Sequence, residues 1–452
     1  MEVVEGLLAA LPHATADHDP RLLAAAARPG RSRDTALRLY RDATENPASA
    51  DGRIRRGLRD ARYLHSRERR FVADGIHGLL RHGEVLAAVL EDDARLTRWL
   101  GWLLTQGLPV ADAADAWKET QPGSVPRFAA VVDLAGALAP LLHTLTPEEA
   151  VALVGSVTPA CASALIRSLG TEVGAFLAAS NARAPVTIRA HRARTEREEL
   201  TGRLAAEGFD ATPTPYAPDG LHIARGGNLV ATATWREGLF EVQDEGSQLI
   251  AALVQPQGLV VDFCAGAGGK TLALSAMMVG GGILAADVRA SALNELQRRA
   301  RRAGIDNVST CVLPPAGAFP RTLNRAMGLA DRVLVDAPCS GSGALRRHPA
   351  YRLRITANTL ASNPVDQRAI LDRAAPLVAR GGRLVYATCS VFVEENDAVV
   401  EDFLSSHPQF ARMPAREVLG AHATDVGDGE VLRVLPHIHS TDGFFGIVLV
   451  RS

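Results

Sequence analysis

The stretch L-V-V-D-F-C-A-G-A-G-G-K-T, residues 259–271, decides the fold. Residues 259–263 form a near-continuous apolar run, which is typical of a strand covered on both faces of a parallel sheet. Gly266, Gly268 and Gly269 line the turn that follows, where the missing side chains let the backbone approach a ligand closely. A helix is expected to begin at Lys270. The stretch therefore predicts a strand, a glycine turn and a helix that together form a ligand site.

The class of ligand follows from the residues around this turn. The ending G-G-K-T is similar to a P-loop, but a Walker A loop needs a glycine five positions before Gly269, where this chain has Cys264. A nucleoside triphosphatase is therefore disfavoured. Asp287 ends the next predicted strand about 20 residues after the turn, the spacing of an acid that binds a ribose. An adenosine-containing cofactor is expected, either NAD or S-adenosylmethionine.

Strand and helix patterns alternate from about Gly246 to the end of the chain. Strands are expected at Ile283–Asp287, Arg332–Asp336 and Arg383–Ala387, and helices at Lys270–Met278, Ser291–Ala303, Val365–Val378 and Glu394–Leu404. Apolar strands that alternate with helices predict an α/β domain with a parallel sheet covered on both faces. The end differs, because Val431–Leu435 and Phe444–Val450 are joined by a turn. These two segments predict an antiparallel hairpin that closes the sheet edge.

Residues 1–180 are rich in Ala, Leu and Arg, and their apolar residues recur three and four positions apart. This period predicts an all-α domain. The stretch from Arg67 to Arg81 is dense in arginine, which indicates either a solvated helix face or a contact with an RNA backbone.

The composition changes near Pro185. A strand is expected from there, then a helix capped by Thr195 and Glu198, then short strands near 221–224 and 229–234. Residues 181–238 thus predict a small α+β module. Its arginines form the most basic local run of the chain: Arg183, Arg189, Arg192, Arg194 and Arg197. This run is the favoured nucleic-acid footprint, and a charged surface linker is the alternative.

The composition excludes several classes of protein. The chain has 452 residues, 47% of them hydrophobic and 22% charged, which predicts two to four globular domains. The formal net charge of −1 means that any polyanion must be bound by local patches. The five cysteines form no CxxC pair and no His/Cys ligand motif, so neither a disulfide framework nor a metal site is expected. The N-terminus lacks a basic region and the apolar stretches are interrupted, so a cytoplasmic protein without membrane spans is expected.

Two cysteines follow predicted strands in small, polar contexts. They lie in D-A-P-C-S-G-S-G, residues 336–343, and in Y-A-T-C-S, residues 386–390. Both segments are expected at the carboxyl edge of the sheet, where open α/β sheets bind ligands. A lone cysteine there is usually a packing residue, but two at one edge indicate chemistry. A dehydrogenase needs neither, so S-adenosylmethionine is favoured over NAD.

From about Leu239 onward the chain resembles the RNA cytosine-C5 methyltransferases, and specifically the RsmB (Sun) family of 16S ribosomal RNA methyltransferases. The matching pieces are Phe240–Leu249, the glycine turn, Gly304–Val308, Asp336–Pro349, Leu384–Asn396 and Thr441–Phe445. Upstream, the motif that begins at Arg69 is similar to the NusB-like RNA-binding domain of that family, and the segment that begins at Pro185 resembles its connecting module. The resemblance implies a NusB-like domain over 1–180, a connecting, RNA-binding module over 181–238, and a Rossmann-like, seven-stranded catalytic domain over 239–452.

The resemblance also implies roles for the site residues. Cytosine C5 is a poor nucleophile, so a cysteine thiolate is expected to add to C6 and activate C5. The family assigns this nucleophile to Cys389 and product release to Cys339. The reversed assignment stays open, because DNA cytosine methyltransferases use the cysteine of a Pro-Cys pair. Asp336 is implied beside the pyrimidine, with Lys270 in contact with Asp336 or the substrate. The implied cofactor site comprises Cys264, Ala265, Gly266, Ala267, Gly268, Gly269, Lys270, Asp287 and Asp336.

The chain departs from the family pattern at three places. Gly266-Ala267 replaces an Ala-Pro pair in the turn, residues 312–315 offer no acid for the adenine, and Ala350–Leu353 replaces an acid followed by Lys-Trp. The expected function is methyl transfer from S-adenosylmethionine to C5 of a cytosine in RNA, most simply 16S ribosomal RNA. A transfer RNA methyltransferase and a non-catalytic RNA-binding assembly factor are the alternatives.

Overall fold

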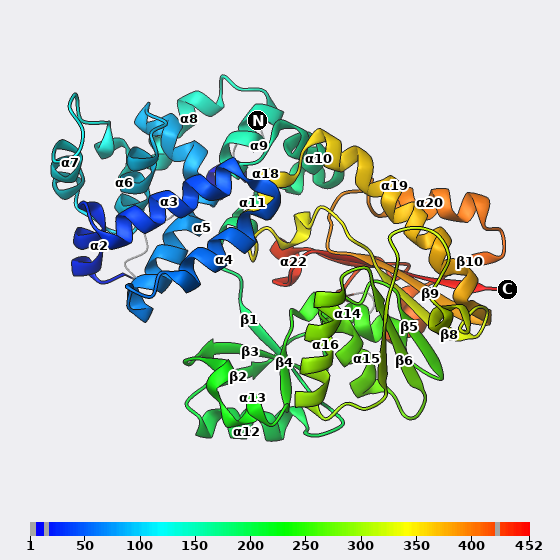
Figure 1. Ribbon diagram of the computed structural model, residues 1–452. Helices are drawn as coiled ribbons and strands as arrows, with labels where there is room; N and C mark the ends of the chain where they lie inside the picture. Colours follow the sequence, from blue (N-terminus) through cyan, green and yellow to red (C-terminus); the bar gives the residue numbers. More distant parts are fainter. Residues whose placement is uncertain (1–5, 13–17, 421–424) are drawn as a thin grey trace. The chain divides into compact units, whose positions relative to one another are not determined.

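The computed structural model describes residues 6–12, 18–420 and 425–452 (Figure 1). Contacts between residues divide the chain into two compact units. The helical unit comprises the chain up to Arg183 together with Ala344–Leu360, and the catalytic unit comprises Ala184–Gly343 and Ala361–Ser452. The predicted division near residues 180 and 238 stays a prediction. Within the predicted catalytic range, however, residues 344–360 pack with the N-terminal helices.

Every regular element that is described up to residue 183 is a helix, as the apolar spacing predicts. The helices are α2 (Pro20–Ala27), α3 (Arg31–Glu45), α4 (Ala50–Asp60), α5 (Ser66–Leu90), α6 (Arg95–Thr105), α7 (Val110–Lys118), α8 (Leu134–Leu142), α9 (Pro147–Gly155), α10 (Pro159–Leu169) and α11 (Val173–Asn181). Their core contains Phe71, Trp99 and Trp102, and the two indole rings lie 5.2 Å apart. Gly78 of α5 faces this core, and a Cβ there would lie 2.1 Å from Trp102 Nε1. The missing side chain therefore sets how closely α5 and α6 approach.

The segment Ala344–Leu360 is held in the helical unit by polar contacts with two helices. It contains helix α18 (Tyr351–Arg354). The buried guanidinium of Arg352 donates to Ser180 O at 3.0 Å, at the carboxyl end of α11. The hydroxyl of Thr158, at the start of α10, donates to Ile355 O. A cation at a helix carboxyl end is favoured by the helix dipole, which explains why a segment from the middle of the chain packs here.

The small module in the catalytic unit is a four-stranded antiparallel sheet with order β2-β3-β1-β4. Its strands are β1 (Val186–Ala190), β2 (Asp210–Pro213), β3 (Gly220–Arg225) and β4 (Phe240–Val242), and helix α12 spans Arg197–Ala206. Two local predictions are wrong. The expected strand at 229–234 is a short 3-10 turn followed by helix α13 (Ala233–Arg236). The expected capping box is absent, because the Thr195 hydroxyl donates to Glu199 at 3.0 Å instead of capping the helix.

Among the described residues the large sheet has eight strands. Seven follow the order β10-β12-β9-β8-β5-β6-β7, and the eighth, β11, pairs with β12. The strands are β5 (Leu259–Asp262), β6 (Gly282–Asp287), β7 (Val308–Val312), β8 (Ala330–Asp336), β9 (Val378–Thr388), β10 (Phe410–Met413), β11 (Leu432–Val434) and β12 (Phe444–Arg451). Strands β5 to β9 are mutually parallel, whereas β12 runs antiparallel to β9 and β10. The α/β class with a Rossmann-like sheet is therefore confirmed.

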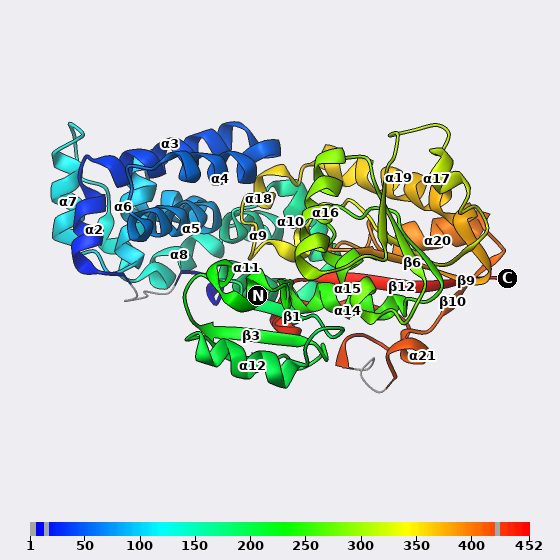
Figure 2. The same ribbon diagram turned by 60° about the horizontal axis from the view of Figure 1, so that its bottom comes forward.

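Helices cover both faces of this sheet (Figure 2). Helices α14 (Glu245–Val254) and α15 (Gly269–Met277) bury one apolar cluster, and α19 (Ala357–Ala374) and α20 (Asp397–Ser406) bury another. Helix α16 (Ala290–Ala303) packs beside α15. The helix expected from Val365 in fact begins at Ala357, so Pro364 lies inside α19 rather than at its start. Among the described residues no single helix is long and apolar enough to cross a bilayer. One sharply bent pair of helical segments, Pro147–Gly155 with Pro159–Asn181, is long and apolar enough by length and composition alone.

The predicted C-terminal hairpin is present, but it does not close the sheet edge. Strands β11 and β12 pair antiparallel through Leu432↔Gly446 and Val434↔Phe444. On the main path of the sheet, β12 lies between β9 and β10, so the four-residue strand β10 forms the edge. A run as short as Phe410–Met413 carries too few alternations to be recognised from sequence.

Candidate active site

The glycine turn after β5 has the backbone conformation that glycine permits. Gly266 and Gly268 have φ values of 55° and 84°, in the left-handed region that side chains disfavour. A Cβ at Gly268 would also lie 2.4 Å from Leu296 Cγ on α16. The turn therefore depends on glycine for its conformation and for close packing.

Asp287, at the end of β6, holds this turn in place. Its Oδ2 accepts from Gly266 N at 2.8 Å, and its Oδ1 accepts from Arg289 N at 2.8 Å and Arg289 Nε at 3.2 Å. A carboxylate has about four acceptor positions, so one position remains for a further donor. The structure thus brings the predicted ribose acid directly against the glycine turn.

The two predicted cysteines meet at the same sheet edge. Cys339, in the loop after β8, lies with its Sγ 3.3 Å from the Sγ of Cys389, which follows β9. Both cysteines are half-buried and neither forms a disulfide. The hydrogen bond with Cys389, together with burial, raises the pKa of the Cys339 thiol well above its ordinary value. Cys339 therefore stays protonated at neutral pH and can donate its S–H toward the neighbouring sulfur.

Lys270 and Asp336 form a buried ion pair beside these sulfurs. The Lys270 ammonium, in the first turn of α15, donates to Asp336 Oδ2 at 2.7 Å and lies 5.0 Å from the centre of the Phe444 ring. Burial alone lowers the pKa of Lys270, but attraction to Asp336 and to Cys389 outweighs it and raises the pKa. The Asp336 side chain is 29% exposed, and its Oδ1 accepts no hydrogen bond from the described residues. A cation is thus held where it attracts Cys389, and one carboxylate oxygen stays available.

Sequence reasoning missed a buried carboxylate that braces the Cys339 loop. Glu395 is fully buried and accepts from Ser340 N at 2.8 Å, from Ser340 Oγ at 2.5 Å and from Asn363 Nδ2 at 2.7 Å. Ser340 directly follows Cys339, and its hydroxyl also lies 3.3 Å from that of Ser390, which follows Cys389. The resemblance over Leu384–Asn396 implies no role for Glu395. The available signal in the sequence is the hydrophilic run Glu394–Asn396, in which the structure buries Glu395 and Asn396.

Asn396 connects the Cys389 loop to the same network. Its side-chain amide accepts from the Thr388 hydroxyl at 2.6 Å and donates to Ser390 O at 2.9 Å, on either side of Cys389. The Ser342 hydroxyl lies 3.0 Å from that of Ser390 and accepts from Val391 N at 3.0 Å. The two cysteine loops are therefore joined by buried hydrogen bonds.

The two arginine-rich runs predicted as RNA footprints are largely engaged within the protein. In the run 183–197, Arg189 is buried, donates to Gln243 Oε1 at 2.8 Å, and has a pKa that burial lowers to about 10. Arg192 pairs with Asp219 at 2.9 Å, and Arg194 donates to Glu237 O at 2.6 Å. In the other run, Arg81 donates to Arg346 O at 2.8 Å and Arg69 to Leu64 O at 3.0 Å. These contacts favour a structural role for most of both runs.

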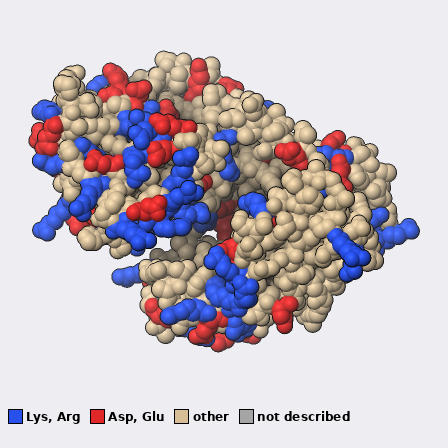
Figure 3. All heavy atoms as spheres, in the orientation of Figure 1, with Lys and Arg blue, Asp and Glu red and all other residues tan. Residues whose placement is uncertain are grey.

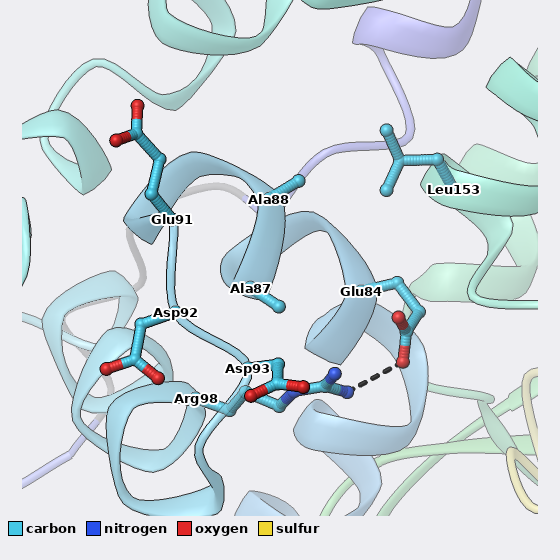
Figure 4. Close-up of a pocket in the computed structure, with 8 residues that line it drawn as sticks. All are labelled: Glu84, Ala87, Ala88, Glu91, Asp92, Asp93, Arg98 and Leu153. Atoms are coloured by element: carbon cyan, nitrogen blue, oxygen red, sulfur yellow. Dashed lines mark hydrogen bonds and ion pairs between the residues drawn. The ribbon is translucent and has the colours of Figure 1, made fainter.

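A hollow of about 670 Å³ lies in the helical unit rather than at the cysteines. Four carboxylates line it, those of Glu84, Glu91, Asp92 and Asp93, and Arg98 pairs with Glu84 at 2.6 Å (Figure 4). Its acidic lining does not suit a polyanion. Over residues 6–12, 18–420 and 425–452, no group of three or more His, Cys, Asp or Glu side chains could hold a metal ion.

The residues at the sheet edge fit an adenosine cofactor with an amino-acid tail. A Cβ at Gly269 would meet no atom within 4 Å, so the backbone at the start of α15 borders open space. The free acceptor position of Asp287 suits a ribose hydroxyl. At the end of β7, Val312 is 49% exposed, so the chain presents an apolar group where the related pattern has an acid. Cys264 is held as a thiol, because burial raises its pKa well above the ordinary value.

Comparisons with known proteins agree with this geometry. The protein family described as 16S rRNA methyltransferase RsmB/F matches residues 250–450, and the family described as Methyltr_RsmF/B-like, ferredoxin-like domain matches residues 162–229. The probable ribosomal RNA small subunit methyltransferase B of Bacillus subtilis (strain 168) is 32% identical over 269 residues, which cover 57% of this chain and 58% of that protein. The ribosomal RNA small subunit methyltransferase B of Salmonella arizonae is 31% identical, covering 61% and 62%. The chain thus spans about 60% of the length of these relatives.

Solved structures share the fold. The crystal structure of PH0851 superposes with a TM-score of 0.71 at 25% sequence identity, covering 92% of this chain and 98% of that one. A methyltransferase homolog from Pyrococcus horikoshii gives a TM-score of 0.57 at 24% identity, covering 68% and 100%. Residues 250–450 are thus similar in sequence to the family described as 16S rRNA methyltransferase RsmB/F, and the chain shares its fold with PH0851.

Proposed function

We propose that the protein transfers a methyl group from S-adenosylmethionine to C5 of a cytosine in RNA, with 16S ribosomal RNA as the substrate. The observation that carries this proposal is the meeting of two free thiols, 3.3 Å apart, at the edge that also holds the glycine turn. The match of residues 250–450 to the family described as 16S rRNA methyltransferase RsmB/F supports the same reaction and substrate. When bound, S-adenosylmethionine supplies the methyl group as an electrophile.

Cys389 carries the first step in this proposal. Its thiolate adds to C6 of the cytosine, and the electron pair of the C5–C6 double bond shifts so that C5 becomes nucleophilic. The Lys270 ammonium attracts the negative charge on this sulfur, and this attraction contributes to the raised pKa of Lys270. The available oxygen of Asp336 accepts a hydrogen bond from the N4 amino group of the base. These two contacts orient the ring and stabilise the covalent adduct.

Cys339 acts when the product leaves. Transfer of the C5 proton to a water molecule restores the C5–C6 double bond and expels the sulfur of Cys389 as a thiolate. Cys339 stays protonated and lies 3.3 Å away, so its S–H donates a hydrogen bond to the departing sulfur. Charge-assisted hydrogen bonds of this kind are stronger than neutral ones, so the contact favours release over the return to the adduct.

Transfer of a labelled methyl group to RNA tests the proposal. The protein is incubated with labelled S-adenosylmethionine and, separately, with 16S ribosomal RNA and transfer RNA, and modified cytosines are mapped. We expect 5-methylcytosine in 16S ribosomal RNA. Label only in transfer RNA would reassign the substrate, and a folded protein that binds the cofactor without any incorporation would indicate a binding factor instead.

The Glu395→Gln protein is expected to show a kcat lowered by about 10- to 100-fold, with little change in the KM for S-adenosylmethionine. Ser340 N and Asn363 Nδ2 donate to Oε1 of Glu395, and the Ser340 hydroxyl donates to Oε2. An amide has a single acceptor oxygen, so it cannot accept at both positions, and small misplacements of reacting groups cost about this much. Glu401→Gln is the matched control, because Glu401 is an exposed carboxylate on α20. Steady-state kinetics check the prediction, and equal kcat values for both variants would contradict a positioning role for Glu395.

A further inference from the structure

We propose that single-stranded RNA next to the target cytosine binds a surface on α4 and the turn that follows it. This surface, the α4 patch, consists of Arg55, Arg56, Arg59, Arg62 and Tyr63. All five side chains are exposed. The inference deepens the proposed function and rests on it, because it names where the helical unit holds the same RNA substrate.

The side chains of the four arginines of the α4 patch form no ion pair and no hydrogen bond with a described residue. Arg21, Arg31 and Arg70 of the helical unit are also exposed without such partners, so the α4 patch is distinguished by having four of these side chains within residues 55–62. Elsewhere in the unit the common arrangement is an arginine paired with a carboxylate, as in Arg28–Glu119, Arg38–Asp42, Arg95–Glu45 and Arg127–Glu91. The chain as a whole has a net charge of −1. Helix α4 also carries two carboxylates, those of Asp51 and Asp60, so the four guanidinium groups leave a local excess of positive charge, which suits a polyanion.

The geometry of α4 places these charges on one outward face. Ile54 is buried and Leu58 is partly buried against the helical core, whereas Arg55, Arg56 and Arg59 are exposed. Arg55 and Arg59 are separated by one helical turn, where like charges repel and lower helix stability. Figure 3 shows that Lys and Arg side chains gather over this part of the helical unit. A phosphate group bound between Arg55 and Arg59 would relieve this repulsion.

Tyr63 indicates that the RNA is single-stranded. Its ring is 47% exposed, directly after Arg62, and its hydroxyl lies 2.8 Å from that of Thr35 on α3. That hydrogen bond holds an aromatic face among arginines, the combination by which proteins bind single strands: guanidinium groups contact phosphates and a base stacks on the ring. In a duplex the bases are already stacked. An acidic protein segment would use the arginines but has no need of the ring.

Charge-matched variants test the arginines. The full-length R55Q/R56Q/R59Q protein is compared with the R321Q/R325Q/R380Q protein, whose three arginines are exposed residues of the catalytic unit without described partners. The probe is a labelled oligoribonucleotide bearing the target cytosine. We expect the α4 variant to bind about 10- to 100-fold more weakly and to lower the slope of log K against log salt by about 2. The control is expected to bind like the wild type, and equal losses in both variants would overturn the proposal.

Two substitutions test the ring. Y63F keeps the aromatic face and loses only the hydrogen bond to Thr35, whereas Y63L loses the ring, so Y63L is expected to bind the oligoribonucleotide at least about fivefold more weakly than Y63F. Annealing the probe to its complement should remove the difference between the two variants. Equal binding by Y63F and Y63L, or an equal difference on duplex RNA, would contradict stacking on Tyr63.

Methylation assays separate this inference from the proposed function. If methyl transfer to RNA occurs, the α4 variant should raise the KM for RNA and leave the KM for S-adenosylmethionine unchanged. If the wild type transfers no methyl group but binds RNA more tightly than the α4 variant does, the proposed function fails and the surface stands. If methyl transfer occurs while RNA binding in the α4 variant equals the wild type, the surface is wrong, and an acidic protein becomes its expected ligand.

Discussion

The Cys389→Ser protein is expected to lose methyl transfer by at least about a thousandfold, because a serine hydroxyl does not ionise near neutral pH and cannot add to cytosine C6. It should bind S-adenosylmethionine with unchanged affinity, since the glycine turn and Asp287 are untouched. It should also form no covalent complex with RNA. Single-turnover assays with labelled cofactor, together with a cofactor titration, measure these properties.

The matched control for this variant is Cys161→Ala, which removes a fully buried thiol in the helical unit without touching the sheet edge. It is expected to keep the rate of methyl transfer close to that of the wild type at a temperature where it is folded. A Cys389→Ser protein that retains a tenth or more of wild-type activity would show that another group is the nucleophile.

The Lys270→Met protein is expected to lose methyl transfer by about 100- to 1,000-fold. Removal of the ammonium takes away the fixed cation beside Cys389 and leaves the partly buried Asp336 without its partner. Preorganised charges at a reacting centre commonly contribute an effect of this size. The chain offers a matched control, because its other lysine, Lys118, is exposed on α7. Lys118→Met is expected to behave like the wild type in rate assays.

The ion pair between Lys270 and Asp336 leads to a second prediction. Because the two side chains act as a unit, the Lys270→Met/Asp336→Asn double variant should be little slower than the slower single variant. Losses that multiply in the double variant would mean that the two residues act independently. A wild-type rate in Lys270→Met would remove the electrostatic part of the proposed mechanism.

The fold of the catalytic unit was predictable because its signals are local and repeated. Residues 259–271 specify a strand, turn and helix by themselves, and the spacing to Asp287 adds the next strand. The carboxyl ends of parallel strands lie at one edge of a sheet. The nearness of Cys339 and Cys389 therefore follows from two motifs that each come directly after a strand. The structure brings these residues and the Lys270–Asp336 pair together.

Other features depend on contacts between distant residues, which a local pattern does not encode. Arg352 looks like a surface residue in sequence, yet it is buried at the carboxyl end of α11, and its segment packs in the helical unit. Arg189 and Arg81 look like nucleic-acid ligands, but they bond to Gln243 and Arg346. Glu395 lies 55 positions from Ser340, the residue that it holds. A polar residue that tertiary structure buries must be hydrogen-bonded within the protein, so its role depends on partners that are distant in sequence.

The identity of the cysteine that bonds to cytosine tests the central claim most directly. The Cys339→Ser protein is incubated with target RNA and S-adenosylmethionine, the complex is denatured and digested, and the peptide that carries a nucleotide is sequenced by mass spectrometry. We predict an RNA complex that survives denaturation, with a methylated cytosine joined to the sulfur of Cys389. A stable complex formed instead by the Cys389→Ser protein, with the nucleotide on Cys339, would contradict this assignment and reverse the roles of the two thiols.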